Sequence, residues 1–189
     1  MLLFSGYVPA ASLFTYPLLN AGRSGSSDIS SNGSTPSAIA YVSTDAAAYF
    51  TIDGAILTGD FTLSFTVSPG NRWGAVGVFV GSETASFDSA AGSGRGGLNA
   101  MTNSFYFMLQ SAGVLGTYKG NTLQTSLIHS GSTAFQLVRV GSTITFKQNG
   151  LTITTLTSQT TADVYVAFAH ANGGSSPADD ITAASVLAA

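Results

Sequence analysis

Carboxylate side chains are sparse along this chain, and their spacing argues against paired-acid chemistry. Hydrolysis of a glycosidic bond needs two carboxyl groups that flank the bond, roughly 5–10 Å apart. Glu83 is the only glutamate, and the aspartates stand singly except for the adjacent Asp179 and Asp180. No segment with strand character carries acids at positions i and i+2. The sequence therefore predicts no pair of catalytic carboxylates.

Nucleophilic catalysis finds no better candidates. The chain has no cysteine, and its two histidines are His129 and His170. A Ser-His-Asp site needs a serine held against a histidine that a carboxylate orients. Serine is so abundant here that a serine near either histidine carries no information, and no Gly-x-Ser-x-Gly motif is present. We expect no catalytic residues and a protein that is not an enzyme.

Residues 172–180, with the sequence Asn-Gly-Gly-Ser-Ser-Pro-Ala-Asp-Asp, form the best candidate for a metal site. Calcium takes about six to eight oxygen ligands, which carboxylates and backbone carbonyls of one loop can supply. Asp179 and Asp180 would be the carboxylates. The favoured interpretation is a solvated turn whose acids precede the next strand, so we expect no metal and no cofactor.

Aromatic rings suggest a binding site of another kind, since exposed rings stack on sugars while neighbouring polar groups bond the sugar hydroxyls. Tyr106, Tyr118 and Tyr165 are candidate platforms, together with Trp73, the single tryptophan, which follows Arg72. A lone tryptophan in a β-sandwich is more often a core residue. The residues retained as candidates for ligand contact are Arg72, Trp73, Tyr106 and Tyr118.

The composition excludes several classes of protein. Only 8% of the 189 residues are charged, the net charge is −3 and 44% are hydrophobic. Six Lys and Arg residues make no basic footprint for nucleic acid. No apolar run approaches the ~20 residues of a membrane span. No basic residue precedes Arg23, so the positive start of a signal peptide is missing.

The elements that would hold any site are β-strands. Phe61–Val67 alternates apolar and polar residues, which is typical of a half-buried antiparallel strand. Asn149-Gly150 is a strong signal for a two-residue hairpin. Short strands at this spacing predict an all-β, antiparallel two-sheet jelly-roll sandwich over residues 46–189. The further predicted strands are Trp73–Val80, Ser104–Gln110, 135–140, Thr143–Gln148, Leu151–Leu156, 164–169 and 181–187.

The alternation also predicts which side chains meet in the core. One buried face should combine two groups of apolar residues: Phe61, Leu63, Phe65 and Val67 on one strand, and Phe135, Leu137 and Phe168 on others. Arg139 continues the Phe-x-Leu-x-Arg phase, so it should point inward and need a partner. The connection 81–101 is long, and loops of that length usually bind something or lie against a partner.

Residues 1–45 differ in composition from the rest. An apolar tip over residues 1–19 is followed by a Gly- and Ser-rich stretch over residues 20–37, which indicates an extended N-terminal arm and linker. The arm has two interpretations: it docks as a strand on its own domain, or it packs on a neighbouring subunit. We expect contacts outside its own sandwich to hold residues 1–37, because the Gly/Ser stretch has little apolar area to offset its ordering.

Residues 135–150 read apolar-x-apolar-x-Arg-x-Gly-x-x-apolar-x-apolar-x-x-Asn-Gly, and this run resembles the central hairpin of concanavalin-A-like jelly-roll domains. Residues 60–67 are similar to the opening strand of that superfamily, and 164–168 and 181–187 are similar to its last two strands. The resemblance implies two packed antiparallel sheets. It leaves function open, because the superfamily includes lectins, glucanases, laminin-G-like modules and viral proteins.

The combination of an apolar-tipped arm, low charge and a Gly/Ser/Thr-rich sandwich favours a structural protein of a virus particle. The first interpretation is a bacteriophage capsid decoration protein or a tail or fibre adhesion protein, located in the virion and anchored by its N-terminal arm. Its partners would be other copies of itself in a homo-oligomer, other virion proteins and a host-surface glycan, with no nucleic acid. The alternative is a carbohydrate-binding, lectin-like module.

Overall fold

The computed structural model describes most of the region that carries the strand signal. Part of the N-terminal segment and several connections fall outside it. The described residues are 14–15, 46–68, 73–86, 97–110, 114–128, 131, 133–171 and 180–188.

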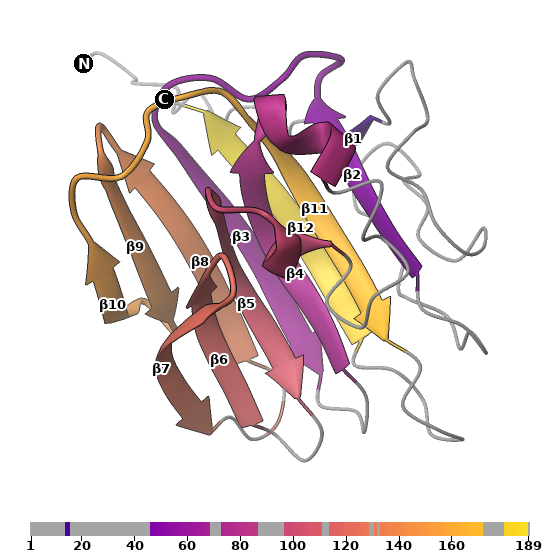
Figure 1. The fold of residues 1–189 in the computed structure, drawn as a ribbon. Coiled ribbons are helices and arrows are strands. Elements are labelled where there is room, and N and C mark those ends of the chain that lie inside the picture. The colour runs from indigo at the N-terminus through magenta and orange to yellow at the C-terminus, as the bar shows by residue number, and fades with distance from the viewer. Residues whose placement is uncertain are drawn as a thin grey trace, which may run out of the picture.

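Two antiparallel sheets pack face to face, as Figure 1 shows. The seven-stranded sheet has the order β1 (Phe14–Thr15), β2 (Ala46–Ile52), β11 (Val164–Ala171), β4 (Trp73–Val80), β5 (Ser104–Gln110), β6 (Val114–Lys119) and β7 (Thr122–Ile128). The five-stranded sheet has the order β10 (Leu151–Leu156), β9 (Thr143–Gln148), β8 (Thr133–Val140), β3 (Phe61–Ser68) and β12 (Asp180–Ala188). The predicted all-β jelly-roll sandwich is confirmed.

The core lies between the sheets, and the side chains that face it are those that the alternation predicted. Phe65 pairs with Phe135 across β3 and β8, and both rings lie against Phe107 from the opposite sheet, at centroid distances of 5.4 and 5.2 Å. All seven residues predicted to share a buried face belong to this cluster. The polar positions between the apolar residues of β3 are only partly buried and lie on its other face.

Several strands were absent from the sequence prediction. The structure adds β2, β6 and β7, and it extends β11 through His170 to Ala171. The hairpin at Asn149-Gly150 has positive φ at both residues, as a type I′ turn requires. Among the described residues, no helix is long and apolar enough to cross a membrane.

The described part of the N-terminal segment, β1, pairs with its own sandwich. Phe14 and Thr15 pair with Ile52 and Thr51 at the edge of the seven-stranded sheet. This pairing agrees with the interpretation of a strand that docks on its own domain. Residues 1–13 and 16–45 lie outside the described part, so the expected anchoring elsewhere and the domain boundary at residue 45 stay predictions.

Arg139 points inward, as its phase predicted, and finds backbone partners at one end of the sandwich. Its side chain is 2% exposed; Nε donates to the carbonyl of Gly59 at 2.6 Å and Nη1 to the carbonyl of Ala162 at 2.7 Å. Burial lowers the pKa of Arg139, and the carboxylates of Asp60 and Asp163 act in the opposite direction. The guanidinium therefore ties the loops that precede β3 and β11 to the end of β8.

Phe135→Ala should destabilise the domain by about 3–5 kcal/mol, because a cavity in the core adds to the lost transfer energy. Leu151→Ala is the control, since Leu151 is 76% exposed and its truncation should cost less than about 0.5 kcal/mol. Urea unfolding of both variants checks the expectation. Equal midpoints would contradict the assigned core.

Arg139→Met should cost about 2–4 kcal/mol of unfolding free energy, since it leaves the carbonyls of Gly59 and Ala162 buried without their donor. Lys147→Met, on β9, is the matched control for loss of a cation and should be nearly neutral. A stabilised Arg139→Met protein would show that the guanidinium is replaceable by apolar packing, as happens for some buried charges.

Candidate functional site

The seven-stranded sheet is buried on its outer face as well as its inner one. A second apolar cluster lies there, away from the core between the sheets. It consists of Tyr49, Ala75, Phe79, Leu98, Met101, Tyr106, Met108, Tyr118, Ala167 and Ala169, with Tyr165 packed against it. This cluster includes residues from the β4–β5 connection as well as from the strands.

The described parts of the β4–β5 connection cover this outer face. The connection begins with η1 (Gly81–Glu83) and a helical turn through Ser86, and it ends with η2 (Leu98–Ala100) before β5. Figure 1 shows both helical pieces in front of β4 and β5. The side chains of Leu98 and Met101 are buried in the outer cluster. In its described parts this long loop packs on its own sheet, and the expectation that it binds something or lies against a partner stays a prediction.

Glu83 holds the two ends of the connection together. Its carboxylate accepts hydrogen bonds from the backbone N of Asn103, at 3.3 and 3.4 Å, and from Asn103 Nδ2, at 2.9 Å. The hydroxyl of Ser104 donates to the carbonyl of Leu98 at 2.5 Å. The only glutamate of the chain therefore has a structural role, and η2 is fixed relative to the start of β5.

The β6–β7 hairpin lies beside η2 and turns at Gly120-Asn121. Gly120 donates its N–H to the carbonyl of Ser104, and its own carbonyl accepts the hydroxyl of Tyr106, both at 2.9 Å. The rings of Tyr106 and Tyr118 stack with a centroid distance of 5.2 Å and an interplanar angle of 9°. Two buried tyrosines thus support the tip of the hairpin from below.

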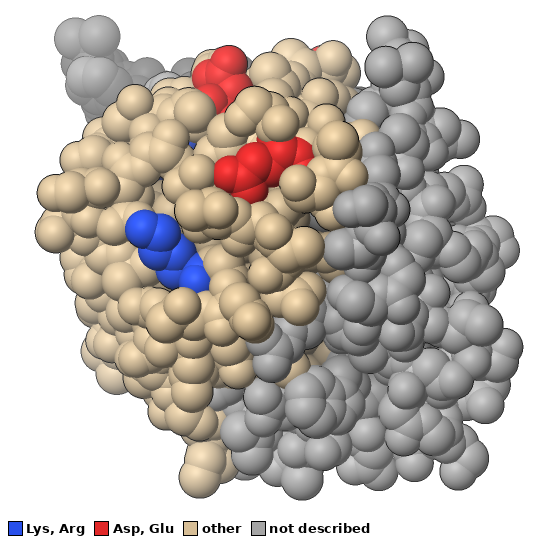
Figure 2. Space-filling model, viewed as in Figure 1, with Lys and Arg blue, Asp and Glu red and all other residues tan. Residues whose placement is uncertain are grey.

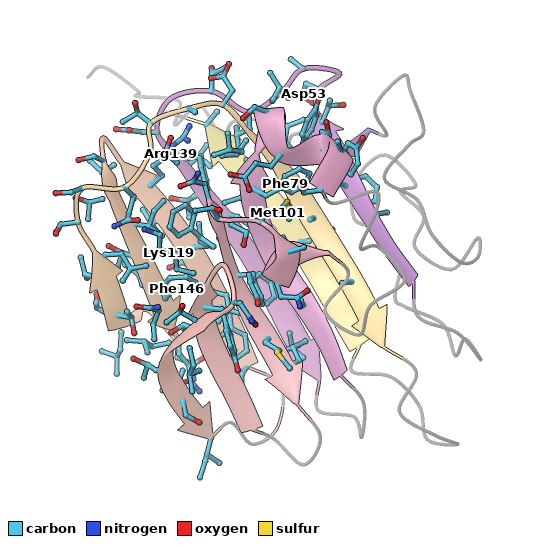
Figure 3. The ribbon with its side chains drawn as sticks, viewed as in Figure 1. Asp53, Phe79, Met101, Lys119, Arg139 and Phe146 are labelled. Atoms are coloured by element: carbon cyan, nitrogen blue, oxygen red, sulfur yellow. The ribbon has the colours of Figure 1, made fainter. Side chains whose placement is uncertain are left out.

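A groove of about 480 Å³ lies between η2 and this hairpin, and we call it the polar groove. Its lining combines amides, hydroxyls and one ammonium group with an apolar share of similar size. The lining residues are Asn99, Ala100, Met101, Thr102, Lys119, Gly120, Asn121, Thr122 and Gln124. Figure 3 shows Met101 and Lys119 on this face of the molecule.

Lys119 supplies the charge of the polar groove. None of the described lining residues is acidic or aromatic. Figure 2 shows the same face as mostly uncharged surface, with one prominent blue patch where Figure 3 labels Lys119 and red, acidic patches above it. The groove can therefore donate and accept hydrogen bonds and hold one negative charge. It presents no acid pair for hydrolysis.

Two of the predicted ligand-contact residues come together, but away from solvent. Tyr106 is fully buried and Tyr118 is 6% exposed, so neither ring is the exposed platform that the prediction assumed. The physical reason is that η2 covers them. Tyr165 packs on Tyr49 at 4.8 Å. Trp73 begins β4, Arg72 lies outside the described residues, and ligand contact at these two positions stays a prediction.

The other candidate residues are not among the described residues that line the polar groove. His170 lies inside β11, opposite Ala46 and Gly74, and His129 falls outside the described residues. Asp180 is the first residue of β12, whereas Asp179 and the rest of the suggested calcium loop fall outside them too. Within the described ranges, no three His, Cys, Asp or Glu side chains gather as metal ligands would.

Sequence reasoning missed the lining of the polar groove. The wall that the β6–β7 hairpin forms could have been predicted, because Gly120-Asn121 between β-branched and aromatic residues is a pattern typical of a two-residue hairpin. The opposite wall had no such pattern. Asn99 and Thr102 look like ordinary polar loop residues until η2 is placed against the hairpin.

No protein-family model matches the sequence, and no curated protein matches it. Solved structures do match. The exoplasmic/lumenal domain of VIP36, in a Ca2+/Man-bound form, aligns with a TM-score of 0.56 and 10% identity over 82% of this chain and 79% of its own. The carbohydrate recognition domain of Emp46p, in a potassium-bound form, gives 0.55 and 9% over 77% and 78%.

The carbohydrate binding module CBM66 from Bacillus subtilis aligns with a TM-score of 0.51 and 6% identity over 78% of this chain and 84% of that module. At these identities the likeness concerns the fold. The chain shares the two-sheet jelly-roll fold of these structures, which agrees with the fold implied by the concanavalin-A-like resemblance.

Gly120→Ala should lower the free energy of unfolding by more than the left-handed backbone conformation alone accounts for. Gly120 and Gly141 both have φ of 53°, so alanine costs about 1–2 kcal/mol at either position through left-handed strain. A Cβ at Gly120 would also lie 2.8 Å from the carbonyl oxygen of Met101, whereas at Gly141 it meets nothing within 4 Å. Denaturant unfolding should show a larger loss for Gly120→Ala than for Gly141→Ala. Equal losses would mean that η2 and the hairpin are not in close contact.

Proposed function

We propose that the protein is a non-enzymatic carbohydrate-binding domain and that the polar groove holds the glycan. The lining of this groove carries the proposal. Thr102 from one wall and Thr122 from the other are exposed and line the groove together with the partly buried Gln124. Hydroxyl and amide groups both donate and accept hydrogen bonds, which suits the many hydroxyls of a sugar.

The hydrogen bonds that hold both walls of the polar groove favour binding of a ligand without rearrangement of the backbone. The tip of the hairpin is held through both backbone groups of Gly120, and Glu83 and Ser104 hold the connection that forms the other wall. A rigid site loses less conformational entropy when a ligand binds. The similarity of the fold to a carbohydrate recognition domain and a carbohydrate binding module adds support from fold alone.

A role in a virus particle remains a prediction about where the domain works. It rests on the composition and on the N-terminal segment, most of which lies outside the described residues. The two proposals are compatible, because a fibre head of a phage can bind glycans of its host. Finding the chain in purified particles would support the virion setting, its mass in solution would test the homo-oligomer, and cross-linking within the particles would test the other virion proteins as partners.

A glycan array with the full chain tests the binding proposal. We expect selective retention of a small set of glycans, and about tenfold weaker binding when Thr102→Ala and Thr122→Ala are combined, since several hydrogen bonds are lost. The matched control is Thr66→Ala with Ser185→Ala. These hydroxyls line a hollow of about 430 Å³ on the outer face of the five-stranded sheet.

The control variant should bind like the unmodified protein. An array without any specific glycan would contradict the proposed function. Binding that the control variant weakens and the groove variant leaves intact would place the glycan on the five-stranded sheet instead.

A further inference from the structure

Lys119 occupies a fixed position at the rim of the polar groove. It is the last residue of β6, pairs with Thr122 across the hairpin and has a half-buried side chain. The next residue, Gly120, is bonded through its N–H to Ser104 and through its carbonyl to Tyr106. The backbone that carries the ammonium group is therefore held in place before any ligand arrives.

Three of the acidic side chains that the structure describes have partners other than Lys119. Glu83 bonds Asn103, the carboxylate of Asp60 accepts the N–H of Gly141 at 2.7 Å, and Asp163 lies near Arg139. Of the described residues that line the polar groove, none is acidic. The positive charge of Lys119 is thus not neutralised by the lining of its own site.

The rest of the groove matches what surrounds a charged group on a sugar. Thr102 and Thr122 line the same groove as Lys119, and their hydroxyls can bond ring hydroxyls of a sugar while Lys119 bonds the anionic oxygens. A charge-assisted hydrogen bond is roughly twice as strong as a neutral one. The net charge of the whole chain is −3, so its overall field does not attract anions, and any preference for them has to arise locally.

We propose that the ligand of the polar groove is an acidic glycan, whose carboxylate or sulfate oxygens bond the ammonium group of Lys119. This inference rests on the proposed carbohydrate-binding function and names its ligand class. Carboxylate and sulfate present the same chemistry to a lysine, namely anionic oxygens beside ring hydroxyls. The experiment therefore includes one pair of probes for each source of charge.

The test is titration calorimetry of the full chain with matched pairs of oligosaccharides. The first pair is an oligogalacturonate and its methyl ester, and the second is a sulfated galactan oligosaccharide and its desulfated form. We expect the anionic member of at least one pair to bind about tenfold more tightly than its neutral counterpart. This preference should weaken as salt is raised, because the lysine is partly exposed to solvent.

Three variants identify the source of the preference. Lys119→Gln should remove the preference for the anionic member while weaker binding of the neutral member persists. Lys119→Arg should retain it, because the charge is kept. Lys147→Gln removes one cation from β9 of the other sheet and should behave like the unmodified protein.

The outcomes separate the two proposals. Equal binding of both members of each pair, or a preference that survives Lys119→Gln, overturns the acidic-glycan inference and leaves carbohydrate binding standing. An equal loss in Lys147→Gln also overturns it, because the effect would then be general electrostatics. If neither pair binds while the array retains neutral glycans, the acidic-glycan inference fails alone. If the array retains nothing either, both proposals fail.

Discussion

Strands β4 and β5 are buried on both of their faces, and this constraint shapes one side of the molecule. Their inward side chains fill the core between the sheets, and their outward side chains form a second cluster that also has to be shielded from water. The β4–β5 connection supplies that cover with Leu98 and Met101. The polar groove lies where the edge of this cover meets the β6–β7 hairpin. The polar groove therefore exists because the β4–β5 connection covers a sheet face that would otherwise be exposed to water.

Buried polar groups of the sandwich bond backbone and side-chain partners, except that Nη2 of Arg139 and Oε1 of Gln159 have no hydrogen-bond partner among the described residues. At one end, Arg139 bonds the backbone of the loops that lead into β3 and β11, so one guanidinium joins segments of both sheets. At the edge of the sandwich, Thr154 of β10 donates to Thr125 of β7 at 2.7 Å. These bonds link the two sheets at places where apolar packing ends. A buried cation is tolerated because strong backbone acceptors surround it.

The function proposed for this fold depends on its surface rather than on its architecture. Two-sheet jelly rolls carry many functions, and likeness at 10% identity or less specifies the arrangement of strands and nothing finer. The described lining of the polar groove contains amides, hydroxyls and a lysine, but no acid pair. That set of groups suits reversible binding of a polar ligand. The tyrosines first considered as sugar platforms contribute indirectly, since Tyr106 and Tyr118 hold the hairpin from beneath.

Alternation along β3 and β8 was sufficient to predict the sandwich, its core phase and the inward direction of Arg139, because side chains of a strand take opposite faces in turn. The same pattern did not reveal β6, nor β7, which lies at the edge of the seven-stranded sheet and has mostly exposed or half-buried side chains. It could not reveal the polar groove either. Asn99 and Thr102 come from one loop and Lys119 and Thr122 from a hairpin, and nothing local to either segment records that they meet. Their meeting is set by long-range packing: the bonds of Gly120 to Ser104 and Tyr106, and the burial of Leu98 and Met101 on the sheet. The alternation of side chains can be read from a short stretch of sequence, whereas a site built from two distant segments forms only when tertiary packing brings them together.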